Sequence, residues 1–187
     1  MTKKIDITLR ITPKMASDAQ GNEKKALVGH LGTHFDVMNK EFPLDYTERQ
    51  GILFDVSAVR NREIGISDIS LEKVCGDMFV AFYTGFIEEE GYGTKRYFRE
   101  HPQLSEELID RLLEKKVSII GIDFAGIRRG AEHPPKDQYC ADRGTFIVEN
   151  LCNLKSIAEL GESFIARTFP MNYGEMTGLP CRVIAEL

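Results

Sequence analysis

The residues with the clearest capacity for chemistry stand together in the segment His30-Leu31-Gly32-Thr33-His34-Phe35-Asp36. It contains two of the four histidines of the chain and a carboxylate, with a glycine between the histidines. Neutral imidazoles and carboxylate oxygens are ligands that divalent metal ions accept. The types and spacing of His30, His34 and Asp36 therefore indicate a metal site, with two unrelated surface histidines in a loop as the alternative.

No regular backbone brings these three side chains onto one ion. In a helix His30 and His34 share a face, but Asp36 points roughly 200° away from His34. In an extended strand all three share a face but spread over roughly 20 Å. The backbone must therefore bend, and we expect the bend at Gly32-Thr33 because glycine tolerates strained dihedral angles.

The elements that must position this segment predict an α/β fold with a mixed sheet. The clearest helix covers residues 105–115, with Ser105 as its N-cap, and shorter helices are expected at 70–74, capped by Ser70, and at 155–160. Alternating or apolar runs predict strands at residues 4–11, 26–28, 51–59, 77–83, 117–122, 146–148, 163–168 and 181–186. The strand–helix–strand order around the clearest helix implies a right-handed crossover and a parallel pair of strands.

Three polar stretches separate these elements. Residues 12–24 are expected to form a loop, and residues 87–100 an exposed excursion with a helical turn around Tyr97. Residues 124–143 are rich in glycine, proline and charge and are expected to form a long loop. A loop of that length in a compact domain is usually functional or disordered.

Length and composition limit the function. A chain of 187 residues with 42% hydrophobic content predicts one domain, residues 1–187, with a sizeable core. The net charge of −5 argues against nucleic acid or an anionic membrane as the main partner, because both require basic patches. No apolar run is long enough to span a membrane, and no signal peptide is recognisable. The four cysteines are widely spaced, which is typical of free thiols in a reducing cytoplasm.

The pattern HxGTHxD resembles the signature of the cyclase-like family of metal hydrolases, which includes bacterial kynurenine formamidase and isatin hydrolase. The resemblance extends over nearly the whole chain in the same order. The matching segments are Asp6-Ile7-Thr8, Pro43-Leu44 with residues 51–57, Tyr83-Thr84-Gly85-Phe86, His101-Pro102-Gln103-Leu104-Ser105, Gly121-Ile122-Asp123, residues 147–151 and residues 180–185.

The resemblance implies a single α/β domain with a central mixed, barrel-like sheet surrounded by helices, assembled as a homodimer or homotetramer. It also implies that His30, His34 and Asp36 hold a divalent metal ion, zinc or manganese. In family members with two ions per chain, the aspartate bridges to a second ion held by a later histidine and glutamate. Glu149 matches that glutamate.

The chain departs from the family pattern at two functional positions. Asp137 stands twelve residues before Glu149, where the family has its later histidine. Asp137 can still bind a hard ion, or His133 on the same segment could reach in instead. Lys40 stands where the family often has a histidine that transfers protons, and Met38 replaces a proline. A lysine serves as an acid or base only if burial lowers its pKa, and otherwise it can clamp an anionic substrate.

The chemistry that the resemblance implies is hydrolysis of an amide, formamide or lactam bond in a small molecule by metal-activated water. Asp36 or Glu149 would orient the water, and Lys40 or His133 would protonate the leaving nitrogen. The missing histidine predicts a substrate different from that of kynurenine formamidase. Two alternatives remain, a metal-binding member without catalysis and a ring-closing cyclase or lyase that uses the same site.

Other polar residues have structural interpretations beside functional ones. His101 is expected to cap or pack at the start of a helix rather than to catalyse. Asp123 either orients a metal ligand through a hydrogen bond or caps a turn. Arg128 and Arg129 form either a clamp for a substrate carboxylate or a solvated surface pair.

Overall fold

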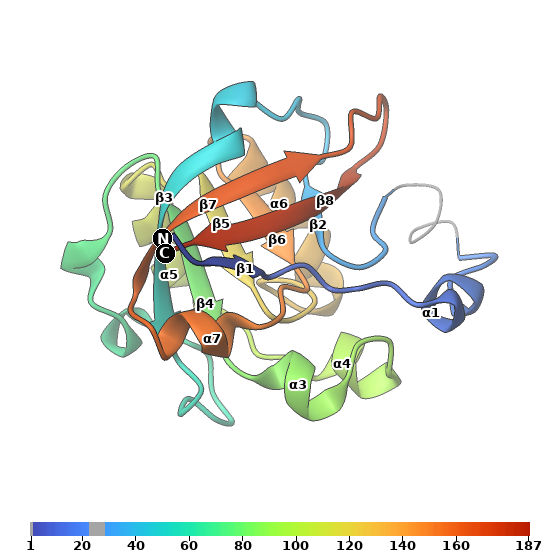
Figure 1. The fold of residues 1–187 in the computed structure, drawn as a ribbon, viewed down its shortest axis with the longest axis horizontal. Coiled ribbons are helices and arrows are strands. Elements are labelled where there is room, and N and C mark those ends of the chain that lie inside the picture. Colours follow the sequence, from blue (N-terminus) through green and yellow to red (C-terminus); the bar gives the residue numbers. More distant parts are fainter. Residues whose placement is uncertain (1, 23–28) are drawn as a thin grey trace.

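A closed β-sheet organises the chain in the computed structural model, which describes residues 2–22 and 29–187 (Figure 1). Within these residues the strand order is β1-β8-β2-β6-β5-β4-β3-β7, and β7 also pairs with β8. That additional pairing closes seven of the eight described strands into a barrel, with β1 attached along β8. The fold class expected from the sequence, a mixed, barrel-like sheet with surrounding helices, is confirmed.

The strands are short, as the sequence pattern indicates, and are joined by short helices. The strands are β1 (Lys4–Asp6), β2 (His34–Asp36), β3 (Glu48–Asp55), β4 (Phe79–Tyr83), β5 (Ile119–Ile122), β6 (Phe146–Glu149), β7 (Ser163–Pro170) and β8 (Gly178–Glu186). The α-helices are α1 (Pro13–Asp18), α3 (Phe86–Glu90), α4 (Lys95–Arg99), α5 (Glu106–Glu114), α6 (His133–Ala141) and α7 (Leu154–Ala158). Single 3₁₀ turns lie at Leu44–Thr47, Ile66–Asp68, Leu71–Lys73 and Gly130–Glu132.

Strand direction determines where the functional side chains gather. Strands β3, β4, β5 and β6 are parallel, so their carboxyl ends meet at one edge of the sheet. Ligands of α/β proteins commonly bind beyond that edge. Strand β2 runs antiparallel between β6 and β8, and this register places His34 directly opposite Glu149. Two parts of the chain that are more than a hundred residues apart are therefore neighbours in the sheet.

The two faces of the sheet belong to two apolar clusters. One cluster contains residues from several strands, such as Phe79 of β4 and Phe164 of β7, whose ring centroids are 5.8 Å apart. The other cluster lies under α5, which buries Leu108, Ile109 and Leu112 on one face. Helix α5 begins as predicted, because the Ser105 hydroxyl accepts a hydrogen bond from the backbone N–H of Leu108.

The prediction of a loop over residues 124–143 is wrong. Residues 133–141 form α6, which begins at His133 with Pro134 and Pro135 in its first turn. Proline is tolerated there because the first N–H groups of a helix have no partner within the helix. The two prolines are therefore as compatible with a helix start as with a loop. As a result, His133 and Asp137 lie one turn apart on the same face.

Other expected elements differ in smaller ways. Residues 13–18 form α1 instead of a loop, with Thr12 as its N-cap, and the first strand ends at Asp6 rather than at residue 11. The turn expected around Tyr97 is present as α4, but the Tyr97 side chain is fully buried rather than exposed. The helix expected at 70–74 is a single 3₁₀ turn without a side-chain cap from Ser70. The strand expected at 26–28 lies outside the described residues.

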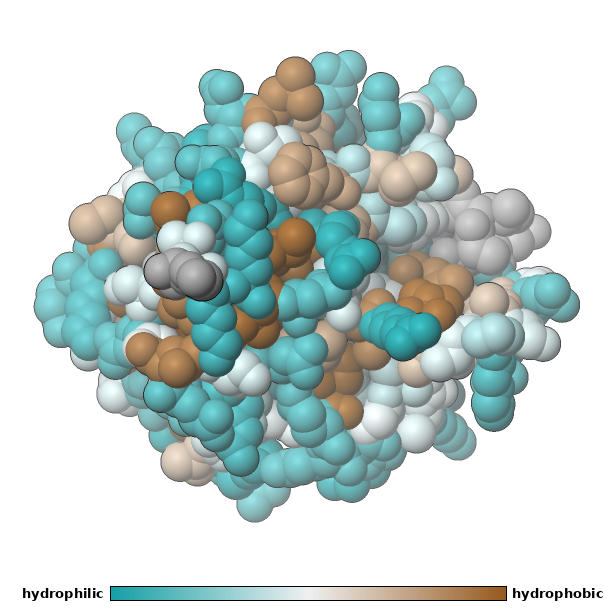
Figure 2. Space-filling model, in the orientation of Figure 1, coloured by the Kyte–Doolittle hydropathy of each residue, from teal (hydrophilic) through white to brown (hydrophobic). Residues whose placement is uncertain are grey.

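The face seen in Figure 2 is largely hydrophilic, with hydrophobic side chains in separate patches. Within the described residues, no helix combines the length and the apolar character that crossing a membrane requires. This agrees with the absence of a long apolar run in the sequence.

Asp123, directly after β5, has the turn-capping role rather than one beside the metal ligands. One carboxylate oxygen accepts hydrogen bonds from the backbone N–H groups of Thr84 and Gly85, at 2.9 and 2.7 Å. The other accepts from the Thr84 hydroxyl at 2.6 Å. Burial raises the pKa of Asp123 to about 7, against the effect of these bonds. Asp123 thus ties the loop after β4 to the end of β5.

The substitution Asp123→Asn should lower the free energy of unfolding by about 1–3 kcal/mol, because an amide N–H₂ would then face buried donors. Chemical denaturation measures this change. Asp110→Asn is the matched control, since Asp110 is exposed and accepts one bond from Tyr139, and it should change stability by less than about 0.5 kcal/mol. Equal effects of the two substitutions would contradict the capping role.

Candidate metal centre

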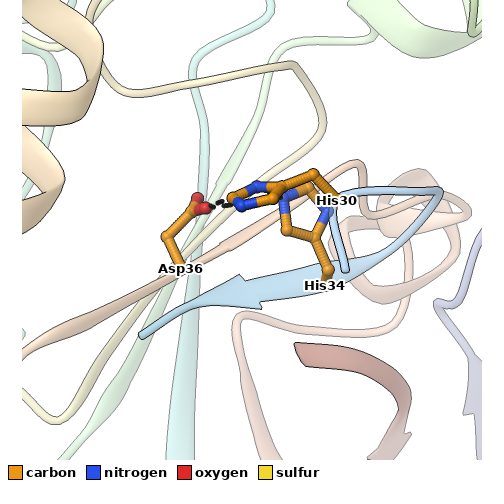
Figure 3. A group of neighbouring side chains, drawn as sticks. All are labelled: His30, His34 and Asp36. Carbon is orange, nitrogen blue, oxygen red and sulfur yellow. Dashed lines mark hydrogen bonds and ion pairs between the residues drawn. The ribbon is translucent and has the colours of Figure 1, made fainter. Parts of the chain in front are cut away.

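His30, His34 and Asp36 converge as the sequence indicates (Figure 3). The Nδ1 atom of His30 lies 3.0 Å from Nε2 of His34 and 3.0 Å from Oδ1 of Asp36. The distance from Nε2 of His34 to Oδ1 of Asp36 is 3.5 Å. The expected bend is present at Gly32, which has a φ of +73°. His34 and Asp36 share a face of β2, and the bend returns His30 to that face.

These distances fit one divalent cation. Zinc binds histidine nitrogen and carboxylate oxygen at about 2.0–2.2 Å with tetrahedral geometry, which places neighbouring ligand atoms about 3.3–3.6 Å apart. The three separations of 3.0–3.5 Å are close to that spacing. Without a cation, the lone pairs of two ring nitrogens and a carboxylate oxygen would face one another at these short distances.

Backbone and side-chain contacts orient His34 for ligation. Its Nδ1 donates a hydrogen bond to the carbonyl oxygen of Gly32 at 2.8 Å, so Nδ1 carries a proton and Nε2 is the nitrogen that would face a cation. The same carbonyl accepts a bond from the side-chain amide of Asn150 at 2.9 Å. The Tyr97 hydroxyl donates a hydrogen bond to the side-chain oxygen, Oδ1, of Asn150. Asn150 therefore holds the turn that holds His34.

Sequence reasoning did not assign a role to Asn150. The residue is buried and has a φ of +59°, a left-handed conformation that asparagine tolerates better than most side chains. The backbone carbonyl oxygen of Asn150 also accepts a hydrogen bond from the Thr33 hydroxyl at 2.8 Å. An asparagine that directly follows Glu149 at a strand end was the available signal.

A close backbone approach positions His30. A Cβ atom on Gly29 would lie 1.9 Å from the carbonyl oxygen of Gly178, so a side chain cannot fit there. This contact places Gly29, directly before His30, against the start of β8. Nε2 of His30 then lies 2.9 Å from the hydroxyl oxygen of Thr177. The hydrogen bond leaves Nδ1 of His30 facing His34 and Asp36.

The second half of the centre comes from α6 and β6. Nε2 of His133 lies 3.0 Å from Oδ2 of Asp137 and 3.0 Å from Oε1 of Glu149. The Oε2 atom of Glu149 is 3.6 Å from Nε2 of His34. Ligand atoms of Asp36, His133 and Asp137 also form a group in which all are within 4.8 Å of one another. The sequence left His133 and Asp137 as alternatives, whereas the structure brings both to Asp36.

Buried negative charge dominates this centre. Asp36 and Asp137 each have a buried carboxylate oxygen without a hydrogen-bond partner in the described residues, Oδ2 and Oδ1, respectively. The buried Oε1 atom of Glu149 contacts Nε2 of His133 at 3.0 Å. Burial disfavours a charged His34 ring, but Asp36 and Glu149 outweigh it and raise its pKa to about 9. Burial, followed by the charge of Asp36, raises the pKa of Asp137 to about 8. The raised pKa values of His34 and Asp137 both indicate that the centre favours added positive charge.

His30 and His133 provide the approach from solvent. Their side chains are 26% and 27% exposed, while those of His34, Asp36 and Asp137 are almost completely buried. Burial opposes a charged His133, yet Glu149 and Asp137 raise its pKa to about 12. The arrangement is a buried carboxylate core with a histidine on each side of the opening.

Lys40 does not join this cluster. Its ammonium group lies 2.7 Å from Asp142, at the end of α6, and the side chain is 38% exposed. The acid–base role expected for Lys40 required burial, and this condition is not met. Lys40 instead lines a cavity of about 710 Å³ between residues 37–47 and 169–179. A contact with an anionic group of a substrate is compatible with that position.

Two other predicted alternatives are decided by burial. The His101 ring is buried and stacks on Phe124 with a centroid distance of 5.7 Å, which is the packing role. Arg128 is not a solvated surface residue, because it is buried and forms ion pairs with Glu63 and Glu132 at 2.7 Å. Arg129 is exposed. The two arginines therefore do not act as a pair.

Comparison with known proteins agrees with this geometry. A family model described as "Putative cyclase" matches residues 5–128, while no curated protein shows significant similarity to the chain. One solved structure is described as a potential metal-dependent hydrolase with cyclase activity. It is 25% identical to this chain, with a TM-score of 0.78 and 100% of each chain covered.

Two further solved structures share the fold. A predicted metal-dependent hydrolase from Bacillus stearothermophilus is 24% identical, with a TM-score of 0.77, and the alignment covers 100% of this chain and 98% of that one. Isatin hydrolase A from Labrenzia aggregata, bound to benzyl benzoate, is 16% identical, with a TM-score of 0.75 and coverage of 100% and 94%. The barrel and its arrangement of helices are therefore common to these proteins.

The substitution Asn150→Asp should weaken binding of zinc or manganese by about 10–100-fold, the usual range for a residue that orients a metal ligand. A carboxylate oxygen would replace the N–H₂ group that donates to Gly32, and the turn would be repelled. Competition with a chelating dye measures the affinity. Asn153→Asp is the matched control, because Asn153 has a φ of +56° but is exposed and bonds to Asp6. Equal affinities of the two variants would contradict the orienting role.

Proposed function

Because the chain belongs to the family described as "Putative cyclase", we propose that it is a metal-dependent hydrolase that cleaves the carbon–nitrogen bond of an amide, formamide or lactam. The observation that carries the proposal is the cluster of three buried carboxylates and three histidines with unpartnered oxygens at its centre. Groups of this type are stable in a folded protein when a cation neutralises them. The reaction is of the arylformamidase type.

The residues present fit one or two divalent cations per chain, zinc or manganese. His30, His34 and Asp36 would hold the first ion. Asp36, His133, Asp137 and Glu149 would hold the second. An ion in this position supplies Lewis acidity, which polarises the scissile carbonyl and lowers the pKa of water towards neutrality.

Glu149 is the residue that we assign to proton transfer. It lies between the two histidines, with Oε2 3.6 Å from Nε2 of His34 and Oε1 3.0 Å from Nε2 of His133. In the proposed reaction Glu149 accepts a proton from the attacking water and returns it to the leaving nitrogen. A C–O bond forms as the C–N bond breaks, and the products are an acid and an amine. His133 is better placed as a ligand than as the acid, because its Nε2 faces two carboxylates.

The cavity beside Lys40 is our proposed site for the organic part of the substrate. Val37 and Met38 line it and directly follow Asp36, while Met176 precedes the Thr177 that contacts His30. Phe42 and Tyr173 contribute aromatic surface. A small molecule with an aromatic ring and an anionic group near Lys40 suits these walls. The homodimer or homotetramer and the cytoplasmic location stay predictions.

Metal content tests the ligand assignment. Purified protein should carry one or two divalent ions per chain, measured by mass spectrometry of the elements, and His34→Ala should lose them. Asp137→Asn should lose only the second ion, because Asp137 is not part of the first group. Full metal occupancy in His34→Ala would overturn the assignment.

Turnover tests the reaction. The metal-loaded protein should hydrolyse at least one member of a panel of formylated anilines, isatin-like lactams and cyclic imides. Product mass separates hydrolysis, which adds one water, from ring closure. If neither zinc nor manganese supports turnover of any member of the panel, the chain is better described as a metal-binding protein without this activity.

Kinetics of two variants should separate the roles of Glu149 and Lys40. Glu149→Gln should lower kcat by about 10²–10⁴-fold, the usual contribution of a general acid–base group. Lys40→Met should raise KM and leave kcat within a few-fold of the original, because Lys40 is exposed and paired with Asp142. A large loss of kcat in Lys40→Met would restore the acid–base role expected from the sequence.

A further inference from the structure

A second cavity, with a volume of about 730 Å³, lies beyond the carboxyl ends of β3, β4 and β5. Its walls come from the loops that follow these strands and from α3 and α4. The ligand residues of the metal centre do not line it. The volume is within the range of about 300–1,000 Å³ for small-molecule sites. The fold thus provides a binding position at the edge where α/β proteins commonly hold ligands.

The lining is rich in arginine although the chain is acidic. Arg60, Arg62, Arg96 and Arg129 face three glutamates, Glu63, Glu89 and Glu100. Three of the four arginines already have carboxylate partners. Arg60 contacts Glu89 at 2.6 Å, Arg62 contacts Asp68 at 2.6 Å, and Arg96 contacts Glu90 at 2.8 Å. One positive charge of the lining, that of Arg129, has no carboxylate partner among the described residues.

Arg129 carries that charge in an available form. Its guanidinium group forms no ion pair within the described part of the chain, and the residue is exposed. Its backbone is fixed, because its N–H donates to the side-chain oxygen of Gln103 at 2.8 Å. The neighbouring Arg128 is anchored by ion pairs with Glu63 and Glu132. A guanidinium on a fixed backbone matches a single carboxylate, which it binds through two parallel hydrogen bonds.

His101 adds a second recognition element to the same wall. Its Nδ1 lies 2.8 Å from the carbonyl oxygen of Pro102, and a carbonyl only accepts, so Nδ1 carries the proton. Burial lowers the pKa of His101 to about 4, so the ring is neutral and Nε2 is an acceptor. The residue is 1% exposed, and Nε2 has no partner in the described residues. A buried acceptor without a donor favours a ligand that supplies an N–H or O–H group.

We propose that this cavity binds a small organic acid that carries an N–H group, with the carboxylate on Arg129 and the N–H directed to Nε2 of His101. The site is separate from the metal centre and does not depend on the hydrolase activity. Because Arg129 is the one arginine of the lining without an ion pair in the described residues, a monoanion fits better than a doubly charged phosphate. Phe86 and Val59 provide apolar contact for the rest of the molecule.

Three matched probes test the chemistry of recognition in isothermal titration of the metal-loaded protein. Hippurate has a carboxylate, an amide N–H and an aromatic ring, and it should bind at one site per chain. Its methyl ester lacks the carboxylate, and benzoyloxyacetate has oxygen in place of the N–H. The ester should bind about 10–100-fold more weakly, and benzoyloxyacetate about tenfold more weakly. Equal binding of all three probes, or no binding of hippurate at millimolar concentration, would overturn the proposal.

Variants locate the probe. Arg129→Gln should weaken hippurate binding by about 10–100-fold and leave the binding of the methyl ester unchanged. The control is Arg99→Gln, because Arg99 is an exposed arginine of α4 that does not line the cavity. Arg129→Gln and Arg99→Gln proteins with the same affinity would overturn the site. His34→Ala should bind hippurate normally, and a loss there would place hippurate at the metal centre instead.

A further variant separates hydrogen bonding from folding. His101→Phe keeps a ring against Phe124 but removes the acceptor. It should weaken hippurate binding by about tenfold and leave the binding of benzoyloxyacetate unchanged. A general disturbance of the wall would weaken both probes equally, and that result would contradict the proposed bond to His101.

Discussion

The structure depends on the burial of three carboxylates, Asp36, Asp137 and Glu149, in one small volume. Isolated buried charges are costly, and like charges close together are more so. Three histidines offset part of this charge, and the pKa values of His34 and His133 rise in response. Oxygen atoms that face no donor remain. A protein would retain such an arrangement because a cation completes it.

The closed sheet is what brings these charges together. Strand β2 fits between β6 and β8, and its register fixes His34 opposite Glu149. The contact between Gly29 and Gly178 then brings His30 back over the strand. Helix α6 adds His133 and Asp137, which lie close to Glu149 of β6 and Asp36 of β2. Each ligand is thus on, or next to, a regular element, and elements of this kind hold a site more accurately than free loops.

The residues around the ligands determine how firmly the centre is oriented. Asn150, Thr33 and Tyr97 form a buried hydrogen-bonded group that fixes the carbonyl of Gly32, and through it the ring of His34.

The carboxyl edge of the parallel strands is used twice. The candidate metal centre lies at β6 and the arginine-lined cavity at β3 to β5, with His101 in the wall of that cavity and His133 among the candidate ligands. Burial is the main cause of the low pKa of His101, and the positive charges of His133 and Arg129 lower it further.

The sequence by itself determined the fold class, most strands, helix α5 and the segment from His30 to Asp36, because these depend on local patterns. Apolar runs mark buried strands, Ser105 marks a helix start, and Gly32 marks the bend. It did not determine that residues 133–141 are helical, since two prolines indicate a loop and a first helical turn equally well. It also left Lys40 open between an acid–base role and a clamp for an anionic substrate, because only burial distinguishes an acid from a surface cation.

Only the tertiary structure decided that His133 and Asp137 act together, that Asn150 supports His34, and that Arg129 is unpaired. Each of these facts is a contact between residues distant in sequence, or the absence of one in the described part of the chain. Local propensity contains no information about which distant carboxylate reaches a given cation. Strand register and helix packing supply that information, since they set the distances on which electrostatic and hydrogen-bond energies depend.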